Sequence, residues 1–163
     1  MRPRRQPRVT VLLLAGLLAA CQQAPPPAPP PAPSTTTANA YGATERAFVE
    51  LAIATDEQAL KLLDLTDRAD LKENRTIELT ALRKLLDAPY VNQHAGHDMP
   101  GMPTDAEIAL AASSRDALDQ FVRTHLTESL EVVRSAGSAI THPPTAEVVQ
   151  LMERHRTAEL AAG

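Results

Sequence analysis

Apolar residues recur at intervals of three and four between residues 44 and 160, which is the period of one face of an α-helix. The first such stretch predicts a helix from about Thr44 to Thr66. Its inward positions are Phe48, Leu51, Ala52, Thr55, Ala59, Leu62 and Leu63, with the acidic Glu45, Glu50 and Glu57 on other faces. A second helix is expected to begin after Asp67 or Asp70 and to stop before Pro89, because the residue before a proline disfavours helix. These two helices predict a helical hairpin.

The second half of the chain predicts another hairpin after a loop at residues 88–103, which is rich in Pro and Gly. Thr104 and Glu107 have the spacing of a capping box, so a short helix should begin there. A longer helix is expected from near Ser114 to Gly137. Its inward positions are Leu118, Phe121, Val122, His125, Ser129, Val132 and Val133. The last helix should follow His142, because prolines are tolerated in a first helical turn.

The two predicted hairpins also resemble each other in sequence. Arg75-Thr76-Ile77-Glu78-Leu79 recurs as Arg156-Thr157-Ala158-Glu159-Leu160, with four of the five residues identical. We interpret the repeat as an internal duplication, and its Arg and Glu residues as ion pairs within or between the hairpins. The chain has no Trp and is rich in Leu and Ala, which favours helix over strand. The predicted fold is all-α, with two hairpins packed as a four-helix bundle.

The N-terminus has the order of charge and apolar sequence that is typical of an export signal. Four arginines precede the apolar run from Val9 to Ala20, which is shorter than the ~20 residues that a membrane-spanning helix needs. Leu18-Ala19-Ala20-Cys21 resembles the lipobox of bacterial lipoproteins, and Cys21 is the sole cysteine. We therefore predict a signal peptide at residues 1–20 and lipidation of Cys21, with the protein anchored on the extracytoplasmic side of the cell membrane or outer membrane.

Residues 21–40 predict a linker, and residues 41–163 a single helical domain. Seven prolines fall between Pro25 and Pro33, and such runs stay extended and cannot pack a core. Removing residues 1–20 takes away four arginines and no acid, which changes the net charge from −4 to −8. A domain this acidic has no electrostatic attraction for nucleic acid or anionic lipid heads, so both are excluded as partners.

Several segments together resemble a known family, the ferritin-like proteins called domain of unknown function 305. The segments are Phe48–Ala59, His94–Met102, Asp119-Gln120-Phe121 and the repeated Arg-Thr-x-Glu-Leu. The resemblance implies a ferritin-like four-helix bundle and, as for several members of the family, an association with copper. The chain departs from the family where a histidine pair is usual in the first helix. It has Thr55 and Asp56 there, and Glu128 and Ser129 in the corresponding part of the third long helix.

The loop between the hairpins holds the main candidate for metal binding. His94, His97, Met99 and Met102 lie within nine residues, and imidazole and thioether are ligands suited to copper, especially Cu(I). The Gly-containing turn between the two histidines could let both rings face one ion, with Met99 or Met102 completing the site. The alternative is a polar loop whose methionines cap the end of the bundle.

Weaker candidates for a metal site lie on the helices. His125 falls on an apolar face, and His155 and Glu159 are four residues apart on one side of the last helix. Such residues can build a cofactor site inside a bundle, although a single histidine in a core is usually a hydrogen-bonded structural residue. A di-iron site is excluded because no Glu-x-x-His occurs. The chain also has no nucleophile elbow or phosphate-binding loop, so we predict that it is not an enzyme.

Two hypotheses of function follow. In the first, a membrane-anchored extracytoplasmic lipoprotein binds copper or another soft metal ion through the His/Met loop, as a buffer or delivery module. In the second, the protein is a metal-free structural or protein-interaction lipoprotein of the cell envelope.

Overall fold

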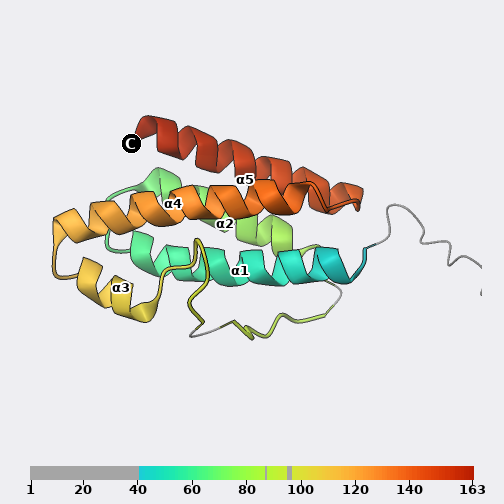
Figure 1. The fold of residues 1–163 in the computed structure, drawn as a ribbon, viewed down its shortest axis with the longest axis horizontal. Coiled ribbons are helices and arrows are strands. Elements are labelled where there is room, and N and C mark those ends of the chain that lie inside the picture. Colours follow the sequence, from blue (N-terminus) through green and yellow to red (C-terminus); the bar gives the residue numbers. More distant parts are fainter. Residues whose placement is uncertain (1–40, 87, 95–96) are drawn as a thin grey trace, which may run out of the picture. The chain divides into compact units, whose positions relative to one another are not determined.

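The computed structural model describes residues 41–86, 88–94 and 97–163. The predicted signal peptide, Cys21 and the linker lie outside the described residues. The described part contains five α-helices and no strand, so the predicted all-α class is confirmed (Figure 1). The helices are α1 (Ala43–Leu63), α2 (Ala69–Arg83), α3 (Asp105–Ala111), α4 (Arg115–Gly137) and α5 (Pro143–Ala162). None of these helices is long and apolar enough to cross a membrane.

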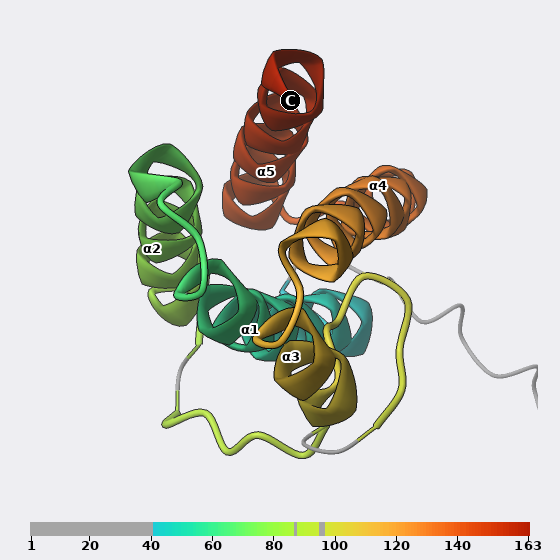
Figure 2. The same ribbon diagram turned by 90° about the vertical axis from the view of Figure 1, so that its left-hand side faces the viewer.

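The four long helices pack against one another in a closed order. α1 packs against α2, α2 against α5, α5 against α4, and α4 against α1. The short α3 packs on α4 and α1, and the segment that precedes it runs along the same side of the domain (Figure 2). The largest apolar cluster joins residues of α1, α2, α4 and α5, with Ile53, Leu82 and Met152 at most 1% exposed. The described residues all belong to one compact unit of the chain.

Most helix ends lie where local sequence signals predict them. Thr104 Oγ1 accepts a hydrogen bond from Glu107 N at 3.2 Å, and Thr104 N donates to Glu107 Oε2 at 2.8 Å, which completes the capping box of α3. Ser114 caps α4 by accepting from Ala117 N. As predicted, α4 ends at Gly137 and α5 begins directly after His142, whereas α1 ends at Leu63, before the predicted Thr66.

The start of α2 differs from the prediction. Its N-cap is Arg68, not Asp67 or Asp70. Arg68 N donates to Thr66 Oγ1 at 3.2 Å, which closes the turn after α1, and the Arg68 guanidinium pairs with Asp70 at 2.9 and 3.0 Å. The ion pair occupies the carboxylate that would otherwise cap the helix.

Helix α1 is buried on more than one face, unlike an amphipathic surface helix, which buries a single apolar face. Beside the predicted inward face, Val49, Ile53 and Asp56 are fully buried, because α2 and α4 pack on different sides of α1. The expectation that Glu45 lies on an outer face is wrong, since this side chain is only 4% exposed. Glu45 Oε1 accepts from Thr141 N at 3.2 Å, and this hydrogen bond is the main reason that the pKa of Glu45 is lowered. Glu45 thus ties the start of α1 to the α4–α5 turn.

Candidate functional site

The two histidines of the loop lie close together in the structure. The ring centroids of His94 and His97 are 6.4 Å apart and the ring planes are inclined by 74°. His97 N donates to His94 O at 3.0 Å, and His94 N donates to Asn92 Oδ1 at 2.9 Å, so hydrogen bonds fix the backbone of both residues. His97 is exposed and His94 is half-buried. Both imidazoles are therefore accessible to an ion from solvent.

The two methionines of the loop form a second turn and differ in accessibility. Met102 N donates to Met99 O at 3.0 Å across Pro100 and Gly101, and Gly101 has a φ of +79°. Met99 is half-buried, whereas Met102 is only 2% exposed and lies among core side chains. The thioether of Met99 is thus the more accessible of the two predicted methionine ligands, and the Met102 side chain is buried in the interior.

The methionine turn is anchored to helices on both sides. Gly101 N donates to Glu128 Oε2 at 2.9 Å, and a Cβ on Gly101 would lie 2.7 Å from the Ser129 backbone of α4. Gln58 Nε2 of α1 donates to Pro103 O at 3.1 Å. These contacts hold the C-terminal part of the loop against α4 and α1.

His125 is buried, as its apolar position predicts, but it does not join the loop histidines in a site. It is 8% exposed and stacks on Phe121 with a centroid distance of 6.3 Å. Its Nε2 lies 3.4 Å from Glu107 Oε2 and its Nδ1 lies 3.8 Å from Glu128 Oε2, and neither ring nitrogen forms a hydrogen bond with the described protein. The two carboxylates face different ring nitrogens, so they cannot share one metal ion with this ring. Burial raises the pKa of Glu107, but hydrogen bonds from Thr104 and the charge of His125 lower it overall.

A network of five charged side chains lies between the hairpins. Its members are Asp56, Arg75, Glu78, Arg156 and Glu159, all at most 5% exposed. Arg75 donates to Glu78 at 2.7 Å, as its i, i+3 spacing predicts, and also to Glu159. Arg156 donates to Glu78 and to Asp56, both at 2.8 Å. The second repeat therefore does not pair within itself. Arg156 and Glu159 find their charged partners in the first hairpin.

Three further side chains complete this core network. His155 Nδ1 lies 2.8 Å from Glu78 Oε1, Arg156 Nε donates to Ser129 Oγ at 2.7 Å, and Asn74 Nδ2 donates to Glu159 Oε1 at 2.8 Å. Two of the weaker metal candidates, His155 and Glu159, thus hydrogen-bond to network members. No three His, Cys, Asp or Glu side chains in the described ranges are arranged to hold a metal ion.

Burial of the network shifts the pKa values of its acids and of its histidine. Burial raises the pKa of Asp56 to about 7 and raises that of Glu78, although Arg75 and Arg156 oppose both shifts. Burial also lowers the pKa of His155. Sequence reasoning did not single out Asp56 as a buried charge. Its spacing from the buried Val49 and Ile53 was the available signal, because residues three and four apart share a helix face.

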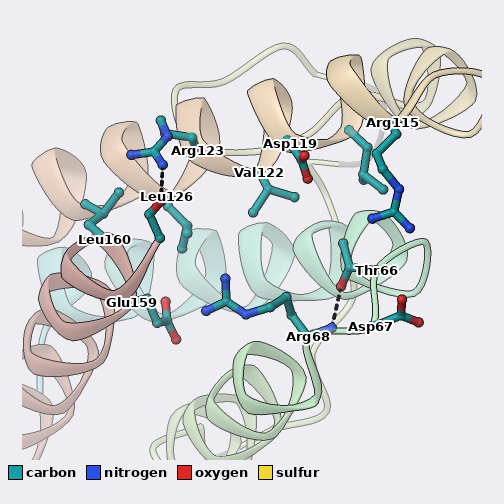
Figure 3. A pocket seen from close by; sticks show the side chains of 12 residues that line it. Thr66, Asp67, Arg68, Arg115, Asp119, Val122, Arg123, Leu126, Glu159 and Leu160 are labelled. Carbon is teal, nitrogen blue, oxygen red and sulfur yellow. Dashed lines mark hydrogen bonds between the residues drawn. The ribbon is translucent and has the colours of Figure 1, made fainter.

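A pocket of about 360 Å³ lies beside Glu159 at the end of the domain, where the α1–α2 turn meets α4 and α5 (Figure 3). Its charged lining residues are Asp67, Arg68, Arg115, Asp119, Arg123 and Glu159. Arg68 pairs with Asp70, and Arg123 donates to Gly163 O, so two of the three guanidinium groups already have partners. Equal numbers of acids and arginines give this pocket no preference for the charge of a ligand.

Comparison with protein-family models, with curated proteins and with solved structures finds no match to the chain. The candidate sites are therefore judged by their own geometry.

Proposed function

We propose that the protein is an exported lipoprotein, anchored through Cys21 on the extracytoplasmic side of a membrane, whose helical domain binds Cu(I) as a buffer or delivery module. The domain would be a ferritin-like four-helix bundle made of the hairpins α1–α2 and α4–α5. The observation that carries the proposal is the pair of accessible imidazoles at His94 and His97, whose backbones share a hydrogen bond and whose ring centroids are 6.4 Å apart.

The chemistry of the loop supports a soft ion rather than a hard one. Imidazole nitrogens bind transition metals at about 2.0–2.1 Å, so rotation of the two side chains suffices to place one ion between the rings. The thioether of Met99, two residues after His97, supplies a soft third ligand of the kind that favours Cu(I). Two neutral imidazoles and a thioether carry no negative charge, which suits a monovalent ion that is bound and released.

The first prediction is a loss of Cu(I) affinity when the accessible ligands are removed. The variant His94→Asn/His97→Asn/Met99→Leu should weaken binding by more than about 100-fold, since losing outer partners of a metal site already costs 10–100-fold. The measurement is a titration against a competing Cu(I) chelator under reducing conditions. All chains should carry Cys21→Ser, because the only thiol of the protein would itself bind copper.

Two control variants make the titration specific. His142→Asn removes a histidine outside the loop, and Met102→Leu removes the buried thioether. Both should bind about one Cu(I) per chain with the affinity of the parent protein. If the parent and the triple variant bind copper equally, the loop is not the site and this proposal is wrong.

The second prediction concerns the anchor. Cys21→Ala should move the protein from the membrane fraction to the soluble fraction of the producing bacterium and abolish incorporation of labelled palmitate, because no other residue can accept the acyl chains of a lipobox. Ser34→Ala, in the same predicted linker, is the matched control and should change neither result. Retention of the Cys21→Ala protein in the membrane fraction would argue against lipid anchoring.

The second candidate function is a metal-free lipoprotein that binds a protein partner. Asp56 and Ser129 occupy two of the positions at which the family resemblance implies metal ligands. The second candidate is favoured because Arg156 donates hydrogen bonds to both residues. A guanidinium at this place repels a cation. The same titration decides between the candidates, since Cu(I) binding no stronger than that of an unrelated acidic helical protein would favour the metal-free function.

A further inference from the structure

The core network holds one more acid than base. Three carboxyl groups, those of Asp56, Glu78 and Glu159, share two guanidinium groups, and burial lowers the pKa of His155, which favours its neutral form. If every acid were ionised, the network would carry one uncompensated negative charge among side chains that are almost completely removed from water. Such a charge is costly in a medium of low dielectric constant, and a buried group commonly avoids the cost by binding a proton.

The geometry indicates which acid carries the proton. Arg156 uses one terminal nitrogen for Asp56 Oδ1 and the other for Glu78 Oε2, both at 2.8 Å, so the two carboxyl groups lie beside each other on one guanidinium. Both side chains are fully buried, yet Asp56 Oδ2 has no hydrogen-bond donor. An ionised Asp56 would leave this oxygen unpaired, whereas a protonated Asp56 becomes a donor toward the neighbouring carboxylate of Glu78.

We propose that Asp56 and Glu78 form a binding site for a single proton, held between their carboxyl groups in the interior, with His155 as the titratable member of the core network that meets solvent. The site makes the fold sensitive to external pH, which is a property separate from the metal loop and from the proposed anchor. His155 suits this place because its side chain is 20% exposed while its Nδ1 contacts Glu78 Oε1.

The charged and titratable groups around the proton come from three helices. Arg75 of α2 and Arg156 of α5 lower its affinity, while Glu159 of α5 raises it. On the α4 side, Ser129 is uncharged, and His125 lines a cavity of about 30 Å³ together with Asp56, Thr55 and Ser129. The burial of Asp56, which raises its pKa to about 7, agrees with the assignment.

The direction of the pH effect follows from this raised pKa. The unfolded chain has the ordinary Asp pKa of 3.8, so the folded protein holds the proton more tightly than the unfolded one between pH 3.8 and about 7. The stability that the proton contributes is complete below pH 3.8 and is lost as the pH rises to about 7. Glu45, Asp70 and Glu107 have lowered pKa values and act oppositely, since their contribution is lost as the pH falls toward and below the ordinary carboxyl pKa. His155 also acts oppositely, because burial lowers its pKa and its contribution is lost as the pH falls below the ordinary His pKa of 6.5. The melting temperature should therefore be highest in mildly acidic solution.

The test measures the melting temperature of the full-length chain in a nonionic detergent by circular dichroism at 222 nm, from pH 5 to pH 8. The wild-type protein should lose on the order of 10 °C over this interval. Asp56→Asn keeps an oxygen for Arg156 but cannot be ionised, so its melting temperature should be nearly constant. Asp119→Asn, at an exposed position of α4, is the matched control and should follow the wild type. An Asp56→Asn protein that keeps the wild-type pH dependence would overturn the proposal.

A second measurement needs no variant, which matters if Asp56→Asn fails to fold. Infrared difference spectra of the wild-type full-length chain should show a protonated carboxyl C=O band that persists at pH 6, where acids with ordinary pKa values are ionised. The band should disappear between pH 6 and pH 8 in the folded protein and be absent at pH 6 in the denatured one. The absence of a protonated carboxyl group in the folded chain at pH 6 would show that the core network holds no proton.

Discussion

Arg156→Met is expected to destabilise the helical domain by about 3–5 kcal/mol, the cost of removing one partner of a buried ion pair. The reason is that Arg156 contacts Asp56, Glu78 and Ser129 at once, at 2.7–2.8 Å, from a position only 1% exposed. Methionine fills much of the volume but supplies no charge or donor, so two buried acids lose their shared counter-ion. The measurement is urea unfolding at pH 7, followed by circular dichroism.

The matched control for this prediction is Arg134→Met. Arg134 also lies in a long helix and pairs with Glu153 at 2.9 Å, but both side chains are about half exposed. An exposed ion pair contributes little, so the change in unfolding free energy should stay below about 1 kcal/mol. Equal effects of the two substitutions would mean that the guanidinium of Arg156 is solvated and that the core network does not stabilise the fold.

Gly101→Ala is expected to destabilise the domain by about 2–4 kcal/mol. Part of this cost, about 1–2 kcal/mol, is the left-handed backbone at φ +79°, which a Cβ disfavours. The rest comes from the new methyl group, which would lie 2.7 Å from the Cα and the N of Ser129. These are backbone atoms of α4 and cannot move aside as a side chain can. Urea unfolding measures the change in stability.

Gly137→Ala is the control for this second prediction. Its Cβ would meet only Val149 Cγ1, at 3.1 Å, and a side chain can adjust to such a contact, so we expect a change within about 1 kcal/mol. Because Gly101 holds the turn that follows Met99, Gly101→Ala should also weaken Cu(I) binding if the proposed loop site is correct. A Gly101→Ala protein as stable as Gly137→Ala would show that the methionine turn does not dock on α4.

The fold could be predicted from the sequence as far as local signals determine it. The capping box at Thr104, the cap at Ser114 and the prolines after His142 act within a single turn of chain, and the structure has helix ends at all three places. The predicted start of α2 is wrong because the sequence offers both Asp67 and Asp70 as the N-cap, and only the geometry of the turn shows that Asp70 pairs with Arg68. The predicted outward position of Glu45 is wrong because its hydrogen-bond partner, Thr141, lies 96 residues away in the sequence.

For the candidate sites too, the sequence predicts local features but not those that depend on packing between distant segments. The clustering of His94, His97 and Met99 is visible in the sequence, but the burial of Met102 depends on how the loop packs against the helices. The exchange of partners between the two Arg-Thr-x-Glu-Leu repeats could not be read from their i, i+3 spacing. That spacing allows pairs within each helix, whereas Glu159 accepts its hydrogen bonds from Asn74 and Arg75 of α2.

This exchange of partners has a consequence for how the chain folds. The hairpin α4–α5 alone would lack Asn74 and Arg75, the two hydrogen-bond donors to Glu159, and the hairpin α1–α2 alone would leave Asp56 and Glu78 to share Arg75. Neither hairpin can therefore bury these charged side chains with their native partners until it packs against the other hairpin. The two hairpins should acquire their native structure in one cooperative transition, without a populated state in which one of them is formed and the other is not.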